Sequence, residues 1–249
     1  MFQLLQQYPI PIYPIAGFTE PFSSMTHLLA ALAFLIMSIF LVRRGRGKIG
    51  RVIFLSIFSF ACIFQFSMSG VYHLLDPGTA RDVLQRLDHA AIFTLIAGSY
   101  TSIHGILFKG LLRWGILLVV WTIAILGITF KSIYFATVPE WVSLSIYLGL
   151  GWVGLISSIA LYVHYGIHYV KLLVFSGIAY TIGAVLEFLR EPILITGVVG
   201  PHELFHVAVI IGAFIHWRFT WHFADGSART FKQVSALADS EAATKRTPG

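Results

Sequence analysis

Long apolar runs, each about 20 residues in length, divide most of the chain. A helix needs about 20 such residues to cross a hydrocarbon core about 30 Å thick, because each residue adds about 1.5 Å. The pattern therefore predicts seven membrane-spanning helices, at residues 22–42, 51–74, 86–106, 111–130, 141–163, 168–188 and 202–221. The expected fold class is an all-α bundle of seven transmembrane helices in a polytopic membrane protein.

The segments outside these helices differ in character. Residues 1–21 hold Pro9, Pro11 and Pro14 among apolar residues, and prolines at this spacing interrupt a regular helix. We expect residues 1–21 to form an irregular arm at the membrane interface and residues 22–223 to form the transmembrane domain. The polar residues 224–249 have too little apolar surface to fold alone, and a disordered tail is predicted there.

The composition agrees with lipid as the solvent for most of the chain. Hydrophobic residues make up 57% and charged residues 11%, against roughly 25% charged residues in a soluble domain. The predicted partner is therefore the lipid bilayer of a cell membrane. The net charge of +6 does not indicate a nucleic-acid partner, because the basic residues lie in short loops and in the C-terminal tail. Cys62 is the single cysteine, which excludes an intrachain disulfide.

The distribution of basic residues predicts an orientation. Of the 17 Lys and Arg residues, 13 lie on the side that the C-terminus shares with the loops after the first, third and fifth helices. The opposite side holds only Arg81, Arg86, Lys131 and Arg190. Basic residues concentrate in cytoplasmic loops. We therefore expect a cytoplasmic C-terminus and an N-terminus outside the cytoplasm.

Polar and ionisable residues gather at one end of the predicted bundle. At membrane depth such side chains cost several kcal/mol unless they are paired or ligated, so they mark functional sites. Consecutive helices alternate in direction, which places the start of an odd-numbered helix beside the end of an even-numbered one. The residues in this layer, on the side poor in basic residues, are His27, Ser69, His73, Asp88, His89, His202, Glu203 and His206.

Three of these histidines have the spacing of a metal site. His202 and His206 are four residues apart, so their side chains leave one helix on the same face, one turn apart. His73 at the end of the second helix supplies a third imidazole. Three nitrogens with an open fourth position form the arrangement in which catalytic zinc holds and ionises a water molecule. The sequence thus predicts zinc bound by His73, His202 and His206.

The other polar residues have predicted roles around that metal. Asp88 is the candidate general base for the metal-bound water, and Ser69 is a candidate to hold an oxyanion or a second water. His27 and His89 are expected to support the ligands, although either could replace one of them. The remaining histidines fall at the other side or at the basic end of the last helix, where an interfacial position is expected: His104, His164, His168, His216 and His222.

The segment from His202 to His206 also matches the HExxH signature of zinc proteases, in which the glutamate is the general base. A further ligand six residues after the second histidine would have to be Gly212, and one about 20 residues on would lie near Asp225, across the membrane. The match is therefore interpreted as accidental. Glu203 is left with two interpretations, a role in the site or a role in a neighbouring loop.

These residues resemble the motifs of the progestin and adipoQ receptor family, whose bacterial branch is called hemolysin III. The family has a glutamate, an asparagine and a histidine at the first span, and Glu20, Ser23 and His27 stand at the matching spacing, with serine replacing asparagine. Two later motifs, Ser-x3-His with Asp-(His/Tyr)-x2-Ile and His-x3-His, are matched over the region from residue 20 to about residue 222 by Ser69, His73, Asp88, His89, Ile92, His202 and His206.

The resemblance implies a seven-helix bundle with zinc on the residues that match His73, His202 and His206, and with Ser69 and Asp88 lining the site. Adiponectin receptors and alkaline ceramidases are related to this family, and hydrolysis of a lipid amide is proposed or established for them. Adiponectin receptors carry their zinc on the cytosolic side. That is opposite to the orientation that the basic residues predict for this chain.

Three classes of function are compatible with the sequence. The first is a zinc-dependent hydrolase of a lipid amide or ester, such as a ceramide-like substrate. The second is a non-enzymatic sensor, regulator or receptor in which zinc only fastens helices together. The third is a pore-forming, hemolysin-like protein, which is disfavoured because the polar residues stop at one end of the bundle. A water in the fourth coordination position would favour the enzyme.

Overall fold

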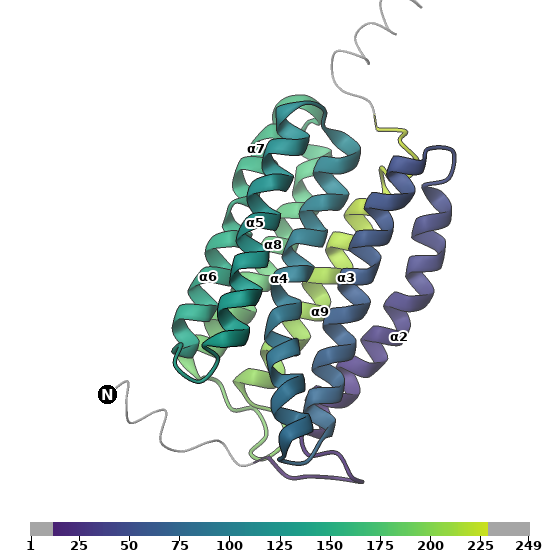
Figure 1. The fold of residues 1–249 in the computed structure, drawn as a ribbon. Helices are drawn as coiled ribbons and strands as arrows, with labels where there is room; N and C mark the ends of the chain where they lie inside the picture. The colour runs from purple at the N-terminus through teal and green to yellow at the C-terminus, as the bar shows by residue number, and fades with distance from the viewer. Residues whose placement is uncertain (1–11, 229–249) are drawn as a thin grey trace, which may run out of the picture.

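The computed structural model describes residues 12–228, which form a bundle of eight α-helices (Figure 1). No strands occur among these residues beyond two isolated bridges. The helices are α2 (Pro21–Arg44), α3 (Ile49–Leu74), α4 (Thr79–Leu107), α5 (Leu111–Ile133), α6 (Glu140–Trp152), α7 (Gly154–Tyr165), α8 (Ile167–Leu189) and α9 (Pro201–Trp221). Because α6 and α7 follow one another within one apolar segment, the helices provide seven spans, which confirms the predicted fold class.

Two elements differ from the sequence prediction. Helix α4 begins at Thr79 rather than near residue 86, because its first two turns are helical but polar and so lie outside the apolar window. The fifth span is divided at Val153, between α6 and α7. Gly151 and Gly154 flank this point, and Tyr100 donates its hydroxyl to the carbonyls of Leu150 and Gly151, at 3.0 and 3.2 Å. Glycine and competition for backbone carbonyls both weaken a helix locally.

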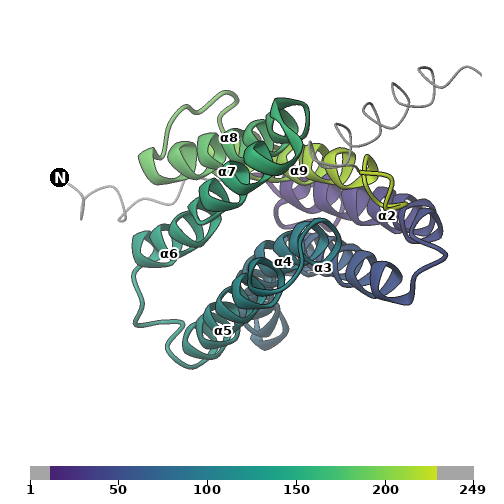
Figure 2. The same ribbon diagram turned by 90° about the horizontal axis from the view of Figure 1, so that it is seen from above.

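The helices are arranged as a ring around an interior cavity. Helix α3 packs between α2 and α4, α9 packs between α8 and α2, and the α6–α7 span lies between α4 and α8 (Figure 2). Some of these contacts are close. A Cβ atom on Gly70 would lie 2.8 Å from Cγ of Leu28, so α2 and α3 approach to a distance that a side chain at this position would prevent.

The outer surface of the bundle is apolar. Leu118 on α5 is 70% exposed and Val163 on α7 is 63% exposed, and many other Leu, Ile and Phe side chains share this position. Continuous apolar surface of this extent is typical of contact with lipid. The surface and the seven spans together support a multi-pass membrane protein that sits in a lipid bilayer.

The predicted arm and tail lie partly outside the described residues. Within the described part of the arm, Tyr13 donates its backbone N–H to the Gly197 carbonyl at 2.9 Å. At the C-terminal side, Ala224 is fully buried against the core of α2, α3 and α9. Arg44 pairs with Asp225 at 2.8 Å, so the segment after α9 is tied to the end of α2.

Candidate metal centre

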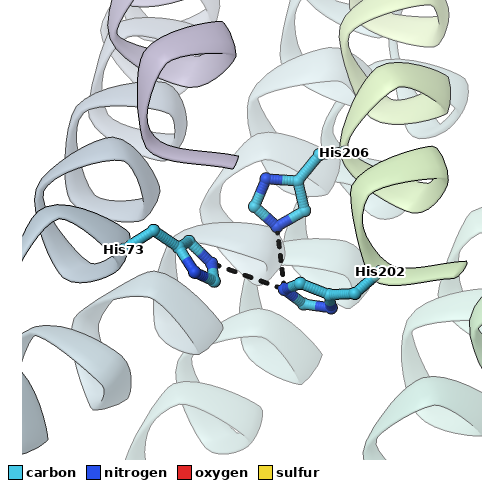
Figure 3. Close-up of side chains that lie close together, drawn as sticks. All are labelled: His73, His202 and His206. Carbon is cyan, nitrogen blue, oxygen red and sulfur yellow. Dashed lines mark hydrogen bonds between the residues drawn. The ribbon is translucent and has the colours of Figure 1, made fainter. Parts of the chain in front are cut away.

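The three histidines of the predicted site lie close together, at the ends of two helices. His73 lies in the last turn of α3, just before the Asp76-Pro77-Gly78 turn. His202 and His206 lie on successive turns at the start of α9, which begins at Pro201. Figure 3 shows His202 and His206 projecting from the same helix toward His73, which reaches them from the opposite side.

The facing atoms are the Nε2 nitrogens. Nε2 of His202 lies 3.4 Å from Nε2 of His73 and 3.1 Å from Nε2 of His206 (Figure 3). The three ligand atoms all lie within 4.8 Å of one another, so the group can hold a metal ion. His73 and His206 are buried, whereas the His202 side chain is 38% exposed. The site is therefore open on the side of His202.

A carboxylate from the start of α2 holds His73. Glu20 accepts a hydrogen bond from Nδ1 of His73 and also pairs with Arg81. Burial alone would raise the pKa of Glu20, but the hydrogen bond with His73 and the positive charge of Arg81 outweigh it and lower this pKa to about 2. Glu20 therefore stays ionised, and it orients the His73 ring with Nε2 toward the other histidines.

A second carboxylate, which the sequence prediction missed, holds His202. Oε1 of Glu187, near the end of α8, lies 3.3 Å from Nδ1 of His202 and 2.9 Å from Arg190. The sequence did contain a signal for Glu187, because it is an acidic residue near the end of an apolar span on the same side of the membrane as the histidines. A metal-binding histidine usually donates its other N–H to a carboxylate, which fixes the tautomer and the ring orientation.

These contacts fix the chemistry of the facing nitrogens. A carboxylate only accepts hydrogen bonds, so Nδ1 of His73 and Nδ1 of His202 must carry the hydrogen. In the neutral rings, Nε2 of both residues then presents a lone pair. Lone pairs of His73 and His202 facing each other at 3.4 Å repel unless a proton or a cation lies between them. The geometry is thus suited to a cation that accepts nitrogen ligands.

His27 stacks on His206, one of the three histidines of this group. Its ring centroid lies 4.0 Å from that of His206, with an angle of 23° between the planes. Its Nε2 lies 3.4 Å from the backbone carbonyl of His206. His27 therefore contacts a candidate ligand directly, and its role as a support for the ligands stays a prediction.

Glu203 serves the start of α9. One carboxylate oxygen accepts the backbone N–H of Gly200 at 2.9 Å, which satisfies a free donor at the helix N-terminus. The other accepts the hydroxyl of Ser23 at 3.0 Å and joins α9 to α2. Of the two interpretations left by the sequence, these contacts favour the structural one. Ser23, which stands where the related family has asparagine, thus has Glu203 as its hydrogen-bond partner.

Ser69 and Asp88, the other two predicted site residues, lie on α3 and α4. Both are buried, and Ser69 precedes His73 by one helical turn on α3. Oδ1 of Asp88 accepts a hydrogen bond from Nε2 of Gln65 at 3.3 Å. His89 points elsewhere: its Nδ1 donates to the Gln85 carbonyl at 2.8 Å, and its ring packs against Phe135.

Comparisons with known proteins show the family of this chain. A family model described as haemolysin-III related matches residues 16–217, a range that contains all three histidines. The chain belongs to the haemolysin-III related family. It is 29% identical over 193 residues to Hemolysin-3 of Bacillus cereus, which covers 77% of this chain and 85% of that protein. It is also 29% identical over 171 residues to the Hemolysin-3 homolog of Bacillus subtilis (strain 168), covering 68% and 80%.

In this haemolysin-III related chain, a cavity of about 360 Å³ adjoins the histidine group. His27, Ser69 and His206 line one end of it and His216 lines the other, with mostly apolar side chains from α4, α6, α7 and α8 between them. His206 and His216 are ten residues apart on α9, which corresponds to about 15 Å along the helix axis. The histidine group therefore opens onto a long apolar space inside the bundle.

Two histidines that were expected at the interface are instead buried in the bundle. Nδ1 of His104 donates to the Leu112 carbonyl at 2.6 Å, and its Nε2 lies 2.8 Å from the Ser157 hydroxyl. Nε2 of His216 lies 3.4 Å from the Ser102 hydroxyl. The interfacial prediction was wrong for His104 and His216, because partners on other helices compensate for their loss of water.

Proposed function

We propose that this chain is a membrane-embedded, zinc-dependent hydrolase that cleaves an amide or ester bond of a lipid. The observation that carries the proposal is the convergence of the Nε2 atoms of His73, His202 and His206 at the end of an apolar cavity. This combination places nitrogen ligands for a metal beside a space suited to a hydrocarbon chain. The names of the Bacillus relatives specify no chemistry, so the proposal depends on the site itself.

The histidine group fits zinc. Zinc binds imidazole nitrogen at about 2.0–2.1 Å in tetrahedral geometry, for which neighbouring ligand atoms are about 3.3–3.4 Å apart. Two of the three separations between the facing nitrogens, 3.1 and 3.4 Å, are close to this value, and the third is within 4.8 Å. Bound there, zinc would supply a Lewis acid and a water whose pKa is lowered toward about 7.

The neighbouring side chains suit hydrolysis. Asp88 is proposed as the general base that accepts the proton of the attacking water, because it is a buried carboxylate held in place by Gln65. Ser69 is proposed to donate its hydroxyl to the oxygen that becomes negatively charged when the carbonyl is attacked. Glu20 and Glu187 hold the rings of His73 and His202 and remain outside the reaction.

The cavity suggests the substrate class. A hydrocarbon chain that enters it removes apolar surface from contact with water or lipid headgroups, and the site end offers the polar groups that a carbonyl needs. The length of about 15 Å between the levels of His206 and His216 corresponds to a chain of roughly 12 carbons. We therefore propose an acyl lipid whose carbonyl lies at the histidine group and whose chain extends toward His216.

A second candidate is a non-enzymatic sensor or regulator with a structural zinc. The observation that favours it is the position of the site at a junction, since His73 belongs to α3, His202 and His206 belong to α9, and Glu187 belongs to α8. A metal there would fasten the ends of α3 and α9 together, and Glu187 would join α8 to them through His202. A pore-forming role, which the word hemolysin in the relatives' names suggests, is the third candidate.

Metal analysis tests zinc binding by the three histidines, which the hydrolase and the structural-zinc proposals share. Purified protein should contain about one zinc per chain, because the three imidazoles form one set of ligands. His73→Ala, His202→Ala and His206→Ala should each remove most of it, while His164→Ala, at an exposed position on α7, should leave it unchanged. Unchanged zinc content in all three folded site variants would show that the assignment of ligands is wrong.

Asp88→Asn separates the enzyme from the structural site. The variant should keep its zinc and lose lipid hydrolysis by about 10²- to 10⁴-fold, the usual scale for the loss of a general base. The measurement is release of fatty acid from amide and ester lipids in detergent or nanodiscs. Full activity in Asp88→Asn would exclude this residue as the base. Absence of hydrolysis in the wild type, with a large fall in thermal stability on zinc removal, would favour the structural role.

A further inference from the structure

One polar side chain in the wall of the cavity has an oxygen without a partner. Gln65 on α3 is only 3% exposed and lines the cavity beside Ser69. Its Nε2 donates to Asp88, whereas its Oε1 has no hydrogen-bond partner among the described residues. A buried carbonyl oxygen that lacks a donor is unfavourable, because it has lost its hydrogen bonds to water, so this position requires an explanation.

The contact with Asp88 decides which way the amide of Gln65 faces. A carboxylate accepts hydrogen bonds and does not donate them, so the NH₂ group must be the part that lies 3.3 Å from Asp88. The carbonyl oxygen is on the same carbon atom and is therefore directed away from Asp88. Gln65 thus presents an acceptor close to the proposed general base.

His27 presents a second acceptor in the same part of the cavity. Its Nε2 lies 3.4 Å from the backbone carbonyl of His206, an approach that is favourable only if this nitrogen carries the hydrogen. Nδ1 then has the lone pair, and it also has no partner among the described residues. Two buried acceptors of this kind create a preference for a group that can donate.

We propose that Gln65 is a specificity-determining residue that accepts a hydrogen bond from the cavity ligand. The ligand class is a lipid that carries an N–H or O–H group near the histidine site, such as a secondary amide or a hydroxylated lipid, in preference to a simple ester. The inference rests on the proposed function in taking the cavity as the substrate-binding part of that site. A ligand without a donor would leave Oε1 of Gln65 unpaired, and buried polar groups of this type discriminate strongly against such analogues.

Three matched probes test this inference without any need for hydrolysis. N-dodecylacetamide donates through its N–H, whereas N-methyl-N-dodecylacetamide and dodecyl acetate have the same chain and no donor. Dissociation constants are measured in lipid nanodiscs from the ligand-dependent rise of the unfolding midpoint. Wild-type protein should bind the secondary amide about tenfold more tightly than either analogue. Equal binding of all three probes by the wild type would overturn the proposal.

Gln65→Met and Tyr180→Phe locate the preference. Methionine matches the length of glutamine and has no carbonyl, so Gln65→Met should reduce the preference for the secondary amide to below about twofold. The probes also partition into lipid, and this effect cancels when each dissociation constant is divided by that of the wild type. Tyr180 lines the same cavity and its hydroxyl is likewise unpartnered among the described residues, which makes Tyr180→Phe the matched control. A preference that survives Gln65→Met and disappears in Tyr180→Phe would contradict the assignment. If the wild type prefers the secondary amide but hydrolyses none of the lipids, this inference is supported and the proposed hydrolase activity is excluded.

Discussion

At the scale of single residues, the two carboxylates behind the histidines decide how the site is built. Glu20 holds Nδ1 of His73, and Glu187 holds Nδ1 of His202. Each carboxylate is in turn paired with an arginine, Arg81 or Arg190. Two of the three rings are therefore fixed in tautomer and direction by side chains that are not themselves among the three candidate ligands. Such partners affect metal affinity through the ligands that they orient.

Glu187→Ala should weaken zinc binding by about 10- to 100-fold, because His202 loses the partner that orients its ring and increases its basicity. The measurement is competition with a chelator of known affinity. Asp225→Ala is the control, since Asp225 is also an acidic residue paired with an arginine but lies at the opposite end of the bundle. Zinc affinity that is equal in the two variants would exclude a role for Glu187 in the site.

At the scale of elements, the start of α9 is the part that positions the site. Glu203 accepts hydrogen bonds from Gly200 within the same turn and from Ser23 on α2. Both His202 and His206 flank this glutamate. The contacts that begin the helix therefore also fix the direction in which its two histidines project. A match to the HExxH signature is explained here by helix capping and helix packing.

Ser23→Ala should lower the free energy of unfolding by about 1–2 kcal/mol, because a fully buried hydroxyl no longer donates to the Glu203 carboxylate. Zinc content should not change. Thr26→Val is the control, since the Thr26 hydroxyl bonds only to carbonyls of its own helix, and we expect less than about 0.5 kcal/mol. Reversible unfolding in mixed micelles measures both. Equal stability of Ser23→Ala and the wild type would show that this contact does not fasten α9 to α2.

At the scale of the whole molecule, orientation decides which compartment the site faces. Within residues 12–228, the end of the bundle that holds the histidine group has the basic residues Arg81, Arg86, Lys131 and Arg190, and the opposite end contains Arg44 together with the turn between α2 and α3. We propose a cytoplasmic C-terminus, which places the histidine group at the outer face of the membrane. The expectation depends on the bias of Lys and Arg toward cytoplasmic loops.

Reporter fusions test this orientation. A fluorescent protein fused after Gly249 should be fluorescent, and alkaline phosphatase fused there should be inactive, because it is active only outside the cytoplasm. The control is a truncated chain with the phosphatase fused after Pro77, in the turn between α3 and α4, which should be active. Phosphatase activity after Gly249 would reverse the orientation and place the histidine group at the cytoplasmic face.

The sequence by itself determined the seven spans and the end of the bundle at which the histidines meet. The physical reason is that lipid requires an apolar run of fixed length for each span, and helices that alternate in direction bring defined ends together. A spacing of four residues placed His202 and His206 on one face without knowledge of any neighbour. Those inferences need only local pattern and the thickness of the membrane.

Only the tertiary structure decided which side chains meet across helices. Glu187 reaching His202, Glu203 accepting from Ser23 and Gln65 donating to Asp88 all join residues on different helices. Hydropathy shows how deep in the membrane a residue lies. It does not show how the helix is rotated about its axis, and so which neighbour the residue faces. That rotation follows from side-chain packing along the whole interface. It explains why His216 was expected at the membrane interface and lies instead at the inner end of the cavity.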